Sequence, residues 1–102
     1  MNVSFPPKLY GVTKKVTFNF ISELAPGETI STATVAATVW SGNDPTPSGI
    51  VSGAASISGT TVTQTITGGV IGTIYKLLCT ITTSAGQTLQ GWGLLAVLAD
   101  EV

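Results

Sequence analysis

The stretch GGVIGTIYKLLCTITTSAGQTLQGWGLLAVL, residues Gly68–Leu98, decides the fold. Residues 74–83 alternate between apolar and more polar side chains, a pattern that predicts a half-buried strand. The sequence Ser84-Ala85-Gly86 predicts a three-residue hairpin loop whose glycine adopts the left-handed conformation. This loop sets Ile81 opposite Leu89. We therefore expect a long antiparallel hairpin at the centre of the molecule.

The register of this hairpin gives its second strand two apolar faces. On the outer face Trp92 lies opposite Leu78, and Leu94 and Leu98 share its side. A free monomer rarely shows solvent an apolar stripe of this kind. We expect these four residues to be buried against another chain. The inner face is expected to join the core, with Tyr75, Leu77, Cys79, Ile81, Leu89, Leu95 and Val97, and Gly93 opposite Leu77.

The rest of the chain predicts shorter strands over residues 14–21, 30–40, 50–57 and 61–67. Ile30 lies on the opposite parity from Val35 and Val39, so we expect a bulge or a sheet switch near residues 31–34. No stretch shows a helical period. The fold class is therefore predicted to be all-β: an antiparallel β-sandwich, immunoglobulin-like, of about seven strands and without an intrachain disulfide.

The first residues predict an extended N-terminal arm, residues 1–13, ahead of a sandwich over residues 14–102. Pro6-Pro7 fixes the backbone and removes two N–H donors. An arm of this kind can add a strand to a neighbour's sheet edge. We therefore add Phe5 and Tyr10 to the predicted partner contacts. No basic stretch followed by an apolar one is present, so secretion is not expected.

Composition excludes several classes of function. The chain has 102 residues, enough for one domain. Charged residues make up only 9%, against about 25% in ordinary soluble domains, which favours a protein that packs against others. Four lysines, no arginine and no histidine argue against nucleic-acid binding. No apolar run approaches the roughly 20 residues that span a membrane.

The chain carries no recognisable reactive site. Cys79 is the only cysteine and histidine is absent, so a catalytic thiol lacks a base and zinc lacks ligands. Asn43-Asp44 could bind calcium weakly, but an Asx-turn before Pro45 is favoured. Gly68-Gly69 and Gly72 precede a strand and are interpreted as turn residues, not as a phosphate cradle. We expect no catalytic, cofactor-binding or metal site, and therefore no enzyme.

The carboxylates support this conclusion. All of them fall in predicted turns or at the C-terminus, where solvated acids are usual, so acid–base work by a close pair is not expected. They are Glu23, Glu28, Asp44, Asp100 and Glu101.

Two aromatic residues carry specific expectations. Tyr75 follows Gly72 in a Gly-x-x-Tyr sequence, and we expect its ring to point inward and its hydroxyl to bond upstream backbone. Trp40 is interpreted first as a core tryptophan. The alternative is an exposed ring that, with the loop over residues 41–49, forms a sugar-binding platform.

Several stretches together resemble a known group of proteins. They are the strand start Gly72-Thr-Ile-Tyr75, the run Thr80-Ile-Thr-Thr83, the turn Ser84-Ala-Gly-Gln-Thr88 and the segment Leu24-Ala-Pro-Gly-Glu-Thr-Ile30. From Val16 to Val97 the chain resembles the small immunoglobulin-like proteins encoded among the head and tail genes of tailed bacteriophages. Members usually carry charges along the last strand, whereas this chain is apolar there.

The resemblance implies a non-enzymatic structural protein of a phage virion, made in the bacterial host cytoplasm. It would act as a capsid decoration, a head–tail adaptor or a fibre-base component. Its partners would be other virion proteins, with the chain forming a homo-oligomer or lying bound to the capsid. No cofactor is implied. The alternative from another class is a carbohydrate- or cell-surface-binding module centred on Trp40.

Overall fold

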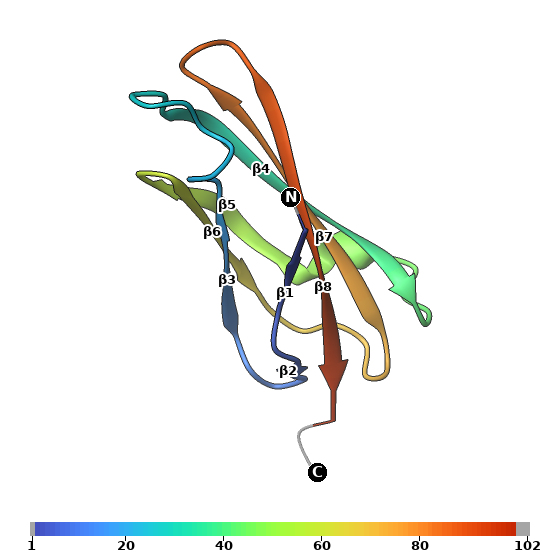
Figure 1. The fold of residues 1–102 in the computed structure, drawn as a ribbon. Coiled ribbons are helices and arrows are strands. Elements are labelled where there is room, and N and C mark those ends of the chain that lie inside the picture. The colour runs from blue at the N-terminus through green and yellow to red at the C-terminus, as the bar shows by residue number, and fades with distance from the viewer. Residues whose placement is uncertain (1, 100–102) are drawn as a thin grey trace.

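The computed structural model describes residues 2–99, with side chains from residue 5 onward, and shows a β-sandwich (Figure 1). The larger sheet has the order β1-β8-β7-β4, with β2 also paired to β8, and the smaller sheet has the order β3-β6-β5. The elements are β1 (Asn2–Ser4), β2 (Lys8–Leu9), β3 (Lys14–Asn19), β4 (Ile30–Ser41), the short 3-10 helix η1 (Pro47–Ile50), β5 (Val51–Ser58), β6 (Thr61–Ile66), β7 (Ile74–Thr83) and β8 (Thr88–Leu98).

The predicted central hairpin is confirmed. β7 and β8 pair antiparallel with Ile81 opposite Leu89, as the loop length required. The loop closes where the Thr83 N–H donates to the Gln87 carbonyl oxygen at 2.9 Å. Gly86 has a φ of 80°, the left-handed conformation that such a loop needs at this position and that favours glycine.

The alternation in the strands places the core between the two sheets. Leu89 is only half-buried and packs at the margin of the core, because it lies close to the loop end of the hairpin. The expected bulge in β4 is present, since the register shifts between Ile30 and Thr32 and thereby turns Ile30 inward. The buried apolar residues include Val16, Phe18, Phe20, Ile30, Ala37, Ile50, Val62, Ile66, Tyr75, Leu77, Cys79, Ile81, Leu95 and Val97.

The N-terminal arm runs along β8 of its own chain (Figure 1). Both of its strands, β1 and β2, pair with β8 in parallel, which departs from the purely antiparallel sandwich predicted from the sequence. The ring of Phe5, just after β1, packs edge-on against Phe18 with centroids 5.4 Å apart. The arm therefore covers one margin of each sheet.

Lys8 anchors the arm in a way that the sequence did not reveal. Its side chain is only 1% exposed, and its ammonium donates to the carbonyl oxygens of Leu9 at 3.0 Å, Tyr10 at 2.9 Å and Gly68 at 2.9 Å. These carbonyl oxygens accept hydrogen bonds from the ammonium group, which offsets its loss of water. This arrangement ties the arm to the loop before β7.

Tyr75 ties two further loops together, and its predicted role is confirmed. Its ring is buried, and its hydroxyl accepts from the N–H of Val70 at 2.8 Å. The same hydroxyl donates to the Asp44 carboxylate at 2.6 Å. Asp44 also accepts from the N–H of Thr46 at 2.9 Å, so the predicted Asx-turn is present. Gly69 allows this close packing, because a Cβ there would lie 2.9 Å from a methyl carbon of Val97.

These hydrogen bonds perturb two pKa values. Donation from Tyr75, followed by donation from the Thr46 N–H, lowers the pKa of Asp44. Burial, followed by its bond to Asp44, raises the pKa of Tyr75. At neutral pH the pair is therefore a protonated phenol donating to an ionised carboxylate.

Replacing Tyr75 with phenylalanine should destabilise the fold by about 1–3 kcal/mol, because two hydrogen bonds are lost. The contribution of the Asp44 bond exists above the ordinary carboxyl pKa of 3.8 and is lost as the pH falls through the lowered folded value. Urea unfolding should thus show a deficit that is largest at neutral pH and shrinks as the pH falls below the ordinary carboxyl value of 3.8. Tyr10→Phe, at an exposed ring, is the control; equal losses in both variants would contradict the assignment.

Lys8→Met should loosen the arm. The three carbonyl oxygens would lose their donor, and we expect a loss of about 1–3 kcal/mol. The clearest readout is hydrogen exchange at Tyr10, whose N–H donates to the Leu98 carbonyl oxygen at 2.9 Å and should exchange faster in the variant. Lys15→Met, at an exposed position on β3, should leave this amide unchanged. Unaltered protection of Tyr10 in Lys8→Met would show that the ammonium does not hold the arm.

Candidate functional site

The outer face of the larger sheet carries the apolar residues that, in the register of the hairpin, point away from the core. Trp92 lies opposite Leu78, and Leu94 lies opposite Lys76, on adjacent rows of β7 and β8. Each of these side chains is half-buried, because its neighbours on the same face of the sheet cover its flanks. With Trp40 of β4, these residues form what we call the tryptophan face: Trp40, Lys76, Leu78, Trp92 and Leu94.

Trp40 is exposed, so its interpretation as a core tryptophan is wrong. It retains 56% of its accessible surface, although its ring stacks on that of Trp92 with centroids 6.0 Å apart and planes at 22°. The cause is alternation: Val39 points toward the core, so the next residue points outward. A register shift between Val39 and Ser41 marks a bulge at Trp40.

Lys76 completes the tryptophan face. Its ammonium nitrogen lies 5.0 Å from the centroid of the Trp92 ring, within the range of a cation–π contact. β4, β7 and β8 contain no aspartate or glutamate, so Lys76 is the one charged residue of these three strands. The tryptophan face thus combines a stacked aromatic pair, two leucines and one positive charge beside the Trp92 ring.

The other predicted partner residues lie apart from this centre. Leu98 is 39% exposed at the end of β8, on the same parity as Trp92. Tyr10 is 48% exposed, and its backbone bond to Leu98 places the two residues together. Phe5 instead packs against Phe18 and is not brought together with the tryptophan face. The sequence predicted one partner surface for all of these residues, because the local sequence pattern does not show that the arm packs on its own chain.

The groups considered for chemistry are dispersed. Glu28 accepts hydrogen bonds from the Thr83 hydroxyl and the Ala25 N–H, which lower its pKa and give it a role in the loops. Glu23 accepts from the hydroxyl of the neighbouring Ser22. Asp100 and Glu101 lie outside the described residues. Among residues 2–99 no cluster of three or more metal-ligating side chains occurs, and no helix is long and apolar enough to cross a membrane.

Comparison with known protein families identifies the family of this chain. Residues 8–92 match the family described as "Gp77: Podophage GP4 fiber-tail adaptor protein gp77". The match runs from β2 into β8 and includes all of β4 and β7, and it covers most of the chain. The chain belongs to this family of phage virion proteins. No curated protein matches the sequence. The resemblance to phage structural proteins is thereby confirmed, whereas its immunoglobulin-like part stays a prediction.

Cys79 should behave as an inert core residue. Burial raises the pKa of its thiol to about 11, so only about one thiol in a thousand is ionised near pH 8. A disulfide reagent such as Ellman's reagent should therefore label the native protein only as fast as it unfolds, and label it promptly in urea. Labelling of the native protein at the rate of free cysteine would contradict this assignment.

Proposed function

We propose that this protein is a non-enzymatic adaptor of a phage tail, which binds another virion protein through the tryptophan face. The observation that carries the proposal is the exposed Trp40 ring stacked on Trp92, on an apolar sheet face, in a member of a fibre–tail adaptor family. Tryptophan is enriched among the residues that carry most of the binding energy of protein interfaces, because it removes much apolar surface from water at low entropic cost.

The family favours one of the three virion positions that the sequence left open. Its description points to the junction of fibre and tail rather than to a capsid decoration. The low charge of the chain suits such a place, because little desolvation of ions opposes burial. Leu98 and Tyr10, at the end of β8, extend the proposed contact beyond the tryptophan face.

The face suits a different protein better than a second copy of the same chain. A symmetric pairing of two tryptophan faces with its two-fold axis near Lys76 would bring two Lys76 ammonium groups together. Because β4, β7 and β8 supply no carboxylate, the like charges would be buried without compensation. We therefore propose a partner that offers an apolar patch and an acceptor for Lys76.

The proposal is tested with the purified fibre and tail proteins of the same phage. The double variant Trp40→Ala, Trp92→Ala should fold but bind its partner on the order of 30-fold more weakly, the loss of about 2 kcal/mol typical of a central anchor. Isothermal titration measures the affinity. Ile21→Ala is the matched control, because Ile21 is a largely exposed aliphatic residue away from this face. Unchanged affinity of the folded double variant would refute the use of this face.

A carbohydrate ligand is the second candidate, because the same stacked pair offers a flat aromatic surface beside the loop after β4. A glycan array with the intact protein decides between the two. Binding that disappears in Trp40→Ala would favour the sugar platform. No glycan binding, together with retained affinity for a tail protein, would favour the adaptor interface.

A further inference from the structure

Within residues 2–99 the two sheets have four outer edges, and three of them are protected against pairing with other chains. The β8 edge is covered in part by the two very short strands of the arm. The β3 edge carries Lys14 and Lys15. The β5 edge is interrupted by a register shift between Ser52 and Ser56. Short strands, lysines and bulges are the devices by which proteins keep sheet edges from acquiring an extra strand.

The fourth edge, β4, has neither a short strand nor a lysine, and its two bulges lie toward its ends, between Ile30 and Thr32 and between Val39 and Ser41. The strand is twelve residues long and contains neither proline nor a charged residue. Its register with β7 is continuous from Thr32 to Val39, so the strand is regular over its middle. In an antiparallel strand every second residue turns its N–H and C=O away from the paired neighbour. β4 therefore presents a row of backbone donors and acceptors along the open side of the sandwich.

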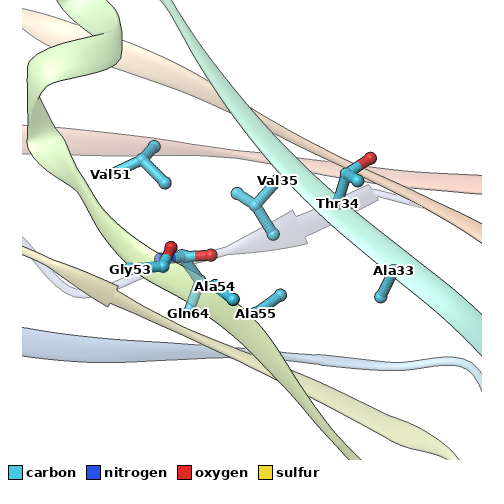
Figure 2. Close-up of a pocket in the computed structure, with 8 residues that line it drawn as sticks. All are labelled: Ala33, Thr34, Val35, Val51, Gly53, Ala54, Ala55 and Gln64. Carbon is cyan, nitrogen blue, oxygen red and sulfur yellow. The ribbon is translucent and has the colours of Figure 1, made fainter.

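A groove lies beside this edge. It has a volume of about 200 Å³ and opens between β4 and β5, the two strands that end their sheets on this side (Figure 2). Val35 of β4 and Val51 of β5 extend into it (Figure 2). Most of the other lining residues are alanine or glycine. The side-chain amide of Gln64 is already bonded to three backbone carbonyl oxygens in β5 and β6. The remaining lining residues are Ala33, Thr34, Gly53, Ala54 and Ala55.

We propose that an extended segment of another virion protein adds to β4 as a strand and places alternate side chains in this groove. The unprotected backbone of β4 selects the occupant's conformation, because only an extended chain can meet that row of donors and acceptors. The lining selects its composition: small or medium apolar residues at every second position, with no charge facing inward. This surface is separate from the tryptophan face and gives the adaptor a second partner site.

The geometry favours a segment over a second copy of this chain. If two β4 strands paired, the inward side chains of each, such as Val35, would remain in the core and groove of their own chain. Both grooves would then stay unfilled. An extended segment brings side chains that can enter the groove. It would therefore hydrogen-bond the free backbone groups of β4 and fill the groove at the same time.

The experiment uses phage particles assembled with the full-length protein. A photo-crosslinking amino acid replaces Ala54, which lines the groove, or Ser58, which is exposed further along β5. The expected product from position 54 is a crosslink to one contiguous segment of a different virion protein, mapped by mass spectrometry. A crosslink to a second copy of this chain would overturn the proposal. So would a yield at position 54 no higher than at position 58.

Hydrogen exchange provides a readout that does not depend on a variant. Alternate amides between Thr32 and Val39 should exchange at least about tenfold more slowly in the particle than in the isolated protein. Unchanged exchange would overturn the proposal. Ala54→Glu should lower incorporation into particles about tenfold while Ser58→Glu does not, because only the former puts a charge in the groove. Equal incorporation of the two variants would count against it, whatever the tryptophan-face variants show.

Discussion

The register of the β7–β8 hairpin is the constraint on which the rest of the structure depends. A three-residue loop closed at Gly86 sets which residues face each other, and a slip of one position would exchange the two faces of β8. In the observed register Leu95 and Val97 enter the core while Trp92 and Leu94 face outward. The core and the candidate binding face are thus two consequences of one loop.

β4 is the element at which the two proposed surfaces meet. Its outer face carries Trp40, and its free edge borders the groove. A chain with little charge has few means of keeping such surfaces soluble and unpaired, so their burial in a particle is physically consistent with the composition. The β3 and β8 edges are blocked by lysines and by the arm, and the β5 edge beside the groove is interrupted by a bulge.

Sequence reasoning succeeded where the period of a strand is decisive. It located the hairpin, the bulge after Ile30 and the inward Tyr75, because each follows from alternation or from loop length. It erred on Trp40, although a signal was present: Trp40 follows Val39 in one strand, so alternation sends Trp40 outward when Val39 points inward. A preference for burying tryptophan outweighed the pattern, and the pattern was the better guide.

By itself the sequence determined strands β3 to β8, their inner faces and the apolar character of the last strand, since these depend on neighbours two residues apart. Only the tertiary structure decided what joins distant segments. From the sequence, Lys8 is expected to be a surface charge, but in the structure its ammonium donates to carbonyl oxygens that include that of Gly68. Asp44 is likewise expected to be a solvated loop acid, but its carboxylate accepts a hydrogen bond from the Tyr75 hydroxyl. The stacking of Trp40 on Trp92 and the groove between β4 and β5 likewise arise from sheet order and packing, which no local pattern encodes.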